Sequence, residues 1–348
     1  MTVSRKTFLV TTAALPLAAL LAACGTKTEA GSSASAGATG SSEALSVTHA
    51  FGTTTVPASP QRVATIAWGN QDVPLALGVM PVGIAKQTWG VSDDSGMLEW
   101  TKAKVDELVA DGASVPALFD ETDAIDFEAV AATSPEVILA AYSGLTQEDY
   151  ETLSKIAPTI AYPDIAWGTA WRDMIRMDSA GMGRKDEGEA LVTELEELIS
   201  TQLADYPQIA GKSAAFFSAT PSDMSSIGFY IPADPRTGFL ADLGLSVPES
   251  VAKAAKADPD TFYVSISAEN ADTLSDVDLM VMYGEDSELA ALQGDALFGA
   301  IPAIKNGAVA FVGNGTALSA ATNPTPLSLP WGLKDYLALI AAAADKVQ

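Results

Sequence analysis

One long amphipathic helix, predicted over residues 186–206, constrains the fold of this chain more than any other feature. Leu191, Leu195, Leu198 and Ile199 recur at helical spacing and form one apolar stripe, while glutamates occupy many of the other positions. About 20 residues at 1.5 Å each give a rod of roughly 30 Å, long enough to join two small domains. We therefore expect a bridge between two halves of the chain. The alternative is an ordinary crossover helix within one large sheet.

The start of the helix and the length of the chain support this division. Asp186, with Glu189 three residues later, is typical of a capping box. At 348 residues the chain exceeds the size at which a single hydrophobic core usually keeps growing. The predicted domains are an N-terminal lobe (residues 45–183), the bridging helix (184–206) and a C-terminal lobe with a closing helix (207–348).

Both halves show the alternating strand and helix signals of an α/β fold. The first half has a predicted hairpin (46–56), strands (62–67, 79–85, 137–141, 159–162) and helices (70–77, 126–132, 148–156). The second half has predicted strands (213–218, 262–266, 279–281, 309–312) and helices (238–243, 330–344). Strands linked in this way form parallel sheets covered on both faces. We therefore predict two Rossmann-like lobes with mostly parallel sheets.

The two halves also share similar sequence patterns. Glu128 stands six residues before Ser134, which leads into a buried strand, and Glu269 stands six residues before Ser275, which leads into another. A second, looser match follows in each half, where an Ile and a nearby Pro precede the last predicted strand. Two matches in the same order favour a duplicated protein with two lobes.

Charge, cysteine and histidine content exclude several classes of function. Forty-four acidic residues against 19 basic ones give a net charge of −25, which argues against nucleic acid and anionic lipid headgroups as partners. Cys24 and His49 are the only residues of their types, which excludes disulfide frameworks, Cys/His zinc sites and Cys–His nucleophilic pairs. The sequence contains no G-x-S-x-G, HExxH or phosphate loop. We predict that the chain is not an enzyme; an extracytoplasmic enzyme is a remote alternative.

The first 44 residues are predicted to be an export signal and a tether. Residues 1–23 carry two basic residues and then an apolar run that is short for a membrane span but suits a signal peptide. The Leu-Ala-Ala-Cys sequence that ends at Cys24 resembles the lipobox of bacterial lipoproteins, which implies cleavage before Cys24 and a lipid on its thiol. Residues 24–44 are rich in Gly, Ser, Ala and Thr, as flexible tethers are. Residues 4–9 also resemble a twin-arginine signal, so both the Sec and the Tat export routes stay open.

The chain from Val47 to its C-terminus resembles the iron-siderophore-binding lipoproteins of ABC importers, which are class III periplasmic binding proteins. The segments that carry the resemblance are, in order, 48–52, 60–63, 68–72, 76–83, 155–159, 239–244, 266–269 and 329–331. The resemblance implies two lobes joined by one rigid helix, and a ligand that is a preformed iron(III) chelate, so that no resident cofactor or protein ligand to a metal is needed. The implied partners are a ferric siderophore and an ABC transporter permease dimer. The chain would act as a monomer held on the outer face of the cell membrane only by the lipid on Cys24. Haem or cobalamin binding is the alternative on the same fold.

Aromatic and cationic side chains follow several predicted strands, where a cleft between the lobes would lie. The predicted ligand-binding residues are Trp68, Trp89, Tyr142, Trp167, Trp171, Tyr230, Arg236 and Tyr283. Arg236 and Tyr230 are the preferred pair, because arginine can donate two hydrogen bonds to chelate oxygens and rings pack on apolar linkers. The alternative for Arg236 is a salt bridge to Asp234 or Asp242. The acidic chain favours a hydroxamate chelate over a trianionic catecholate.

Glu128 and Glu269 have a different predicted role. In the family that the chain resembles, one acid on the outer surface of each lobe docks into an arginine pocket of the permease, and these two positions match that pattern. The alternative is an acid favoured by the positive end of a helix dipole. His49 is predicted to be a strand residue of the opening hairpin, without a role in metal binding.

Overall fold

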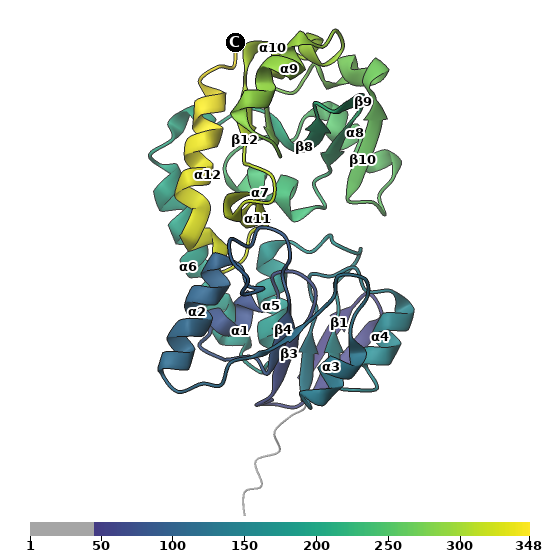
Figure 1. The fold of residues 1–348 in the computed structure, drawn as a ribbon, viewed down its shortest axis with the longest axis vertical. Helices are drawn as coiled ribbons and strands as arrows, with labels where there is room; N and C mark the ends of the chain where they lie inside the picture. The colour runs from purple at the N-terminus through teal and green to yellow at the C-terminus, as the bar shows by residue number, and fades with distance from the viewer. Residues whose placement is uncertain (1–44) are drawn as a thin grey trace, which may run out of the picture. The chain divides into compact units, whose positions relative to one another are not determined.

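The computed structural model describes residues 45–348, which form two α/β lobes joined by one long helix (Figure 1). The predicted signal peptide, the lipidation site Cys24 and the tether lie outside the described residues. No helix within residues 45–348 combines the length and the apolar character needed to cross a membrane.

The N-terminal lobe is built on a five-stranded sheet in the order β5-β4-β3-β6-β7, with every pair parallel. Its elements are β1 (Leu45–His49), β2 (Gly52–Val56), β3 (Val63–Thr65), α1 (Asp72–Ala76), β4 (Gly83–Ala85), α2 (Glu99–Ala110), β5 (Ala117–Phe119), α3 (Phe127–Ala132), β6 (Val137–Leu139), α4 (Gln147–Leu153), β7 (Thr159–Ile160) and α5 (Trp171–Gly181). All three residues of β3, β4 and β6 are buried, as expected for strands covered by helices on both faces. The predicted hairpin forms a separate sheet of β1 and β2.

The C-terminal lobe also contains a five-stranded sheet, in the order β10-β9-β8-β11-β12. Its elements are η1 (Pro207–Ile209), β8 (Ala214–Thr220), β9 (Asp223–Tyr230), α7 (Pro235–Asp242), α8 (Glu249–Ala257), β10 (Tyr263–Ser267), η2 (Ala268–Leu274), β11 (Leu279–Met282), η3 (Asp286–Glu288), α9 (Leu289–Gly294), η4 (Phe298–Ala300), α10 (Pro302–Asn306), β12 (Val309–Phe311), α11 (Ala317–Ala321) and α12 (Ser328–Ala344). Strands β8, β11 and β12 are parallel, whereas β9 runs antiparallel to both of its neighbours. The prediction of two lobes with mostly parallel sheets is confirmed.

The bridging helix is α6 (Lys185–Leu203), which is three residues shorter at its C-terminal end than predicted. Its buried positions are Gly188, Val192, Leu195 and Ile199, so the apolar stripe is shifted slightly from the predicted one. The predicted capping box is wrong: the N-cap residue is Arg184, without a side-chain cap, and Asp186 lies inside the first turn near the positive end of the dipole. The presence of two separate sheets excludes the alternative of a single large sheet.

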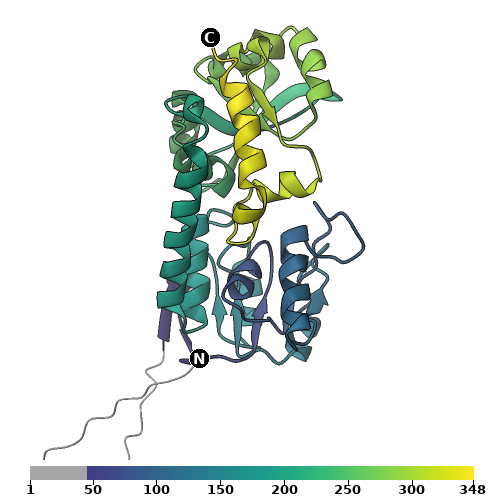
Figure 2. The same cartoon turned by 90° about the vertical axis from the view of Figure 1, so that its left-hand side faces the viewer.

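Helix α12 runs beside α6 (Figure 2), and the segment before it returns to the N-terminal lobe. In this segment the Thr325 hydroxyl donates a hydrogen bond of 2.5 Å to the fully buried carboxylate of Asp72 in α1. The same carboxylate accepts from the Trp100 indole and the Thr101 hydroxyl of α2, each at 2.7 Å. One buried acid therefore ties α1, α2 and the chain that enters α12 into a single network.

His49 lies in β1 as predicted, and its imidazole is buried. Ring atom Nδ1 accepts a hydrogen bond from the backbone N–H of Phe51 at 3.2 Å, and Nε2 lies 2.8 Å from the Thr54 hydroxyl. Because Nδ1 accepts, the neutral ring with its proton on Nε2 fits this site. Burial lowers the pKa of His49 below its usual value.

We therefore expect acid to weaken the fold at His49. Protons bind this group more readily in the unfolded chain, so its contribution to stability is lost as the pH falls below about 6.5. The chain contains one histidine, so in an untagged protein every imidazole proton resonance belongs to His49, and its NMR titration reports the pKa directly. A titration midpoint below about 6.5 is expected; a midpoint at or above that value would contradict the buried, neutral ring.

Candidate functional site

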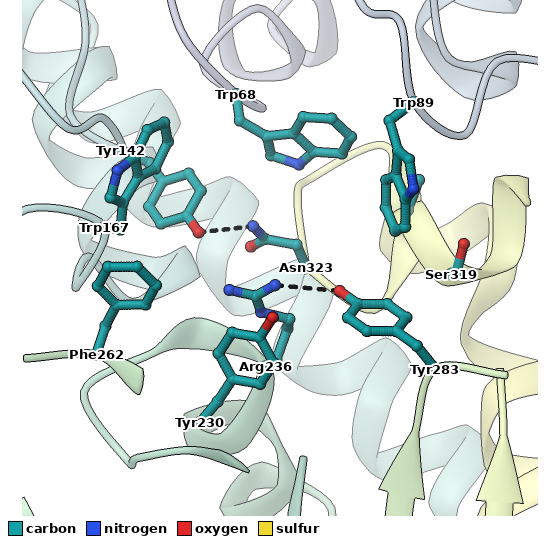
Figure 3. Close-up of a pocket in the computed structure, with 11 residues that line it drawn as sticks. Trp68, Trp89, Tyr142, Trp167, Tyr230, Arg236, Phe262, Tyr283, Ser319 and Asn323 are labelled. Atoms are coloured by element: carbon teal, nitrogen blue, oxygen red, sulfur yellow. Dashed lines mark hydrogen bonds between the residues drawn. The ribbon is translucent and has the colours of Figure 1, made fainter. Parts of the chain in front are cut away.

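A pocket of about 340 Å³ lies where the two lobes face each other (Figure 3). Its lining residues are Trp68, Trp89, Tyr142, Trp167, Tyr230, Arg236, Phe262, Tyr283, Ser319, Ala320 and Asn323. The N-terminal lobe contributes residues that follow β3, β4, β6 and β7, and the C-terminal lobe contributes residues from β9, α7 and the segment after β11. Five of the described lining residues, Trp68, Trp89, Tyr142, Trp167 and Tyr283, therefore follow the carboxyl ends of parallel strands, where open α/β sheets bind their ligands.

Among the described residues that line the pocket, Arg236 alone carries a formal charge, and three neighbours hold it in place. Its Nε and Nη2 atoms donate to the two carboxylate oxygens of Asp234 at 2.8 and 2.6 Å, and Nη1 donates to the Tyr283 hydroxyl at 3.1 Å. The guanidinium carbon lies 3.7 Å from the centre of the Tyr230 ring, a cation–π contact. Burial opposes the charge of Arg236, but the contact with Asp234 outweighs it and raises the pKa of the guanidinium.

Asp234 has no solvent-exposed surface, and it also caps α7 by accepting from the backbone N–H of Arg236 at 2.9 Å. The salt bridge that the sequence offered as an alternative for Arg236 therefore exists, with Asp234 as the partner. It does not remove Arg236 from the pocket. The pair fixes the direction of the guanidinium and leaves the site with little net charge.

Lining residues of the two lobes also contact each other directly at the pocket. The Asn323 amide donates to the Tyr142 hydroxyl at 2.8 Å, and the rings of Trp89 and Tyr283 meet edge to face at 5.5 Å. The Trp68 indole N–H is buried without a hydrogen-bond partner, and Figure 3 shows it pointing toward the interior of the pocket. A buried donor without a partner is costly, so a ligand oxygen at this position would be favourable.

Seven of the eight predicted ligand-binding residues line the pocket. The exception is Trp171, the first residue of α5, which is only 2% exposed. Its indole donates to Asp242 at 2.9 Å, and the neighbouring Arg172 pairs with the same carboxylate at 2.8 Å. Because α5 begins there and its first turn faces α7 of the other lobe, Trp171 joins the lobes and lies outside the pocket.

The sequence prediction did not include four lining residues, Phe262, Ser319, Ala320 and Asn323. Phe262 was placed inside a predicted strand, but β10 begins one residue later. The other three residues lie in or just after the short helix α11, which carries no strong local signal. These three residues reach the pocket because the segment that precedes α12 passes between the two lobes.

Glu128 and Glu269 lie away from the pocket, both exposed and each in the first turn of its helix, α3 and η2. Neither carboxylate takes part in a hydrogen bond or ion pair within residues 45–348. In the same part of the chain, no group of three or more His, Cys, Asp or Glu side chains is arranged to hold a metal ion.

Comparison with known proteins agrees with this architecture. The model of a family described as periplasmic binding protein matches residues 63–314. The crystal structure of PiaA from Streptococcus pneumoniae TIGR4 in complex with ferrichrome is 46% identical, with a TM-score of 0.83 over 87% of this chain and 100% of that chain. The structure of Staphylococcus aureus SirA complexed with staphyloferrin B is 22% identical, with a TM-score of 0.62 over 86% of this chain and 97% of that chain, and supports the fold alone. A probable siderophore-binding lipoprotein, YfiY from Bacillus subtilis strain 168, is 26% identical over 249 residues, which are 70% of this chain and 69% of its own length.

Proposed function

This chain belongs to the periplasmic binding protein family, and we propose that it captures a ferric siderophore between its two lobes and delivers it to an ABC importer. The observation that carries the proposal is the aromatic pocket around Arg236. PiaA, the relative of 46% identity that was crystallised in complex with ferrichrome, supports the same ligand class.

The chemistry of the pocket suits a preformed chelate. The seven aromatic side chains that line the pocket can pack on the apolar linkers of a siderophore, while the Arg236 guanidinium and the Trp68 indole can donate to its oxygens. The iron arrives with its coordination sphere filled, so the chain needs no resident cofactor and acts by binding and release. PiaA was crystallised with a bound siderophore and YfiY is a probable siderophore-binding lipoprotein, which is consistent with a chain that is not an enzyme.

The charge of the pocket favours a neutral hydroxamate chelate over a catecholate trianion. Arg236 already shares its charge with Asp234, so little positive charge remains to bind a trianion. The whole chain carries a net charge of −25, which repels an anion at long range. A neutral ferric trihydroxamate needs no positive charge in the pocket and is not repelled by the acidic chain.

Quenching of tryptophan fluorescence tests this preference, because three of the six tryptophans line the pocket. We expect ferrichrome or a ferrioxamine to bind at least about tenfold more tightly than ferric enterobactin, with the difference shrinking at high salt. A Trp331→Phe variant is a control for the signal, because Trp331 lies on α12 outside the pocket. Tightest binding of the trianion would overturn the hydroxamate preference, and failure to bind any ferric chelate would overturn the proposed function.

We also propose where the protein acts in the cell and how it contacts the permease. A lipid on Cys24 would hold the mature chain on the outer face of the cell membrane, within reach of the permease. We propose that it works there as a monomer, presenting Glu128 and Glu269 to the two halves of a permease dimer. The positions of the two acids support this arrangement, because Glu128 is exposed in the first turn of α3 in one lobe and Glu269 is exposed in the first turn of η2 in the other.

A further inference from the structure

A smaller cavity of about 190 Å³ lies beside the main pocket, next to the carboxyl ends of β3 and β4. We call it the lateral cavity. It shares Trp68, Trp89 and Trp167 with the main pocket. Its other lining residues are Ala67, Ala85, Lys86, Gln87, Thr88, Glu121 and Thr122. The same three tryptophans border both spaces, so the lateral cavity adjoins the main pocket.

Glu121 is the distinctive group of this cavity. Its Oε2 atom accepts a hydrogen bond from the backbone N–H of Ala67 at 2.9 Å, but Oε1 is buried without any partner. No ion pair within residues 45–348 includes Glu121, and the nearby Lys86 instead lies 3.8 Å from Asp120. Burial without an opposing cation raises the pKa of Glu121 to about 7.

The backbone around Glu121 is also strained. Ala67 and Trp167 adopt left-handed conformations, with φ of 59° and 60°, that residues with side chains rarely occupy. Both residues line the lateral cavity, and strain of this kind concentrates at binding sites. The bond from Ala67 to Oε2 supports one of these conformations and leaves Oε1 free.

We propose that the lateral cavity is a subsite for a primary ammonium group on the periphery of the chelate, with Glu121 as its counter-ion. This inference rests on the proposed function, because the ammonium must be attached to a chelate in the main pocket. A buried carboxylate without a cation is unfavourable, and a ligand ammonium would supply both the missing charge and a donor for Oε1. Arg236 cannot serve Glu121 in this way, because its charge is committed to Asp234.

The test compares two ligands that differ only in this group: ferrioxamine B, a linear ferric trihydroxamate that ends in a primary ammonium, and its N-acetylated, uncharged derivative. At pH 8, we expect the native protein to bind the ammonium form about tenfold more tightly. In Glu121→Gln the ratio should fall to about one, because the amide can still accept from Ala67 but carries no charge. Asp123→Asn is the matched control, because Asp123 is a nearby exposed acid that takes part in no ion pair within residues 45–348 and does not line the lateral cavity, and it should keep the native ratio.

The two chelates also separate this inference from the proposed function. Equal affinity of the native protein for both chelates, or the same ratio in native protein and Glu121→Gln, would overturn the subsite while leaving chelate capture intact. Loss of binding to every ferric chelate would instead overturn the proposed function. Because the comparison of the two ligands in the native protein needs no variant, poor folding of Glu121→Gln would not leave the subsite untested.

Discussion

Replacing Arg236 by alanine will weaken chelate binding by about 10- to 100-fold, the loss expected when a charged hydrogen-bond donor is removed from a buried site. The same change will lower the free energy of unfolding by about 3–5 kcal/mol, because it leaves the buried Asp234 carboxylate without its cation. Fluorescence titration measures the first effect, and urea denaturation followed by circular dichroism measures the second. An unchanged affinity would remove Arg236 from the binding site.

Arg236→Lys separates the two effects. A lysine keeps a positive charge beside Asp234, so most of the lost stability should return. It cannot reproduce the planar fork that reaches both Asp234 oxygens and the Tyr283 hydroxyl, so chelate affinity should stay low. If Arg236→Lys recovered chelate affinity to the same degree as the free energy of unfolding, the role of Arg236 would be only to pair with Asp234.

Much of the fold could be predicted because its main elements are specified by patterns of residues within short segments of the sequence. The hairpin over β1 and β2, the short buried strands and the bridging helix α6 each carry a clear pattern of apolar residues. Strand β9 was missed because its first half alternates exposed and half-buried positions among polar residues. Helix α5 was missed for a related reason: its buried face includes Asp178, Ser179 and Gly181, which hide the helical period.

The buried small and polar residues of α5 have a packing reason that a sequence pattern does not reveal. Helices α5 and α6 approach each other so closely that a Cβ atom at Gly188 would lie 1.9 Å from the Ser179 hydroxyl oxygen. Small residues at the contact are therefore needed where a pattern search expects large apolar ones. The bridge is held to the N-terminal lobe by this contact.

The sequence predicted the lining residues that follow strands. It did not predict the lining residues in α11 and in the segment between α11 and α12. Trp68, Tyr142 and Tyr283 follow strands directly, so the topology of an α/β sheet places them in the cleft. Asn323 lines the pocket and donates to Tyr142, and two residues later Thr325 bonds to Asp72 across the lobes, a contact between residues 253 positions apart in the sequence. No local pattern encodes such a contact.

Replacing both Glu128 and Glu269 by alanine will reduce uptake of radiolabelled ferric chelate by cells about tenfold or more, while chelate affinity of the purified protein stays unchanged. Both carboxylates are exposed and lie outside the pocket, so binding and folding should lose little. Loss of an ionic contact with the permease would lower the rate and the strength of docking. Each single variant should show a smaller defect, because the other lobe still docks.

Glu148→Ala combined with Glu249→Ala is the matched control, because these exposed acids lie in the first turns of α4 and α8, one in each lobe. If Glu128 and Glu269 were only acids favoured by helix dipoles, both double variants would behave alike in uptake and in stability. A transport defect confined to Glu128 and Glu269, at equal protein abundance, assigns these two residues to the permease contact. Equal uptake by both double variants would instead show that Glu128 and Glu269 are ordinary surface acids without a role in docking.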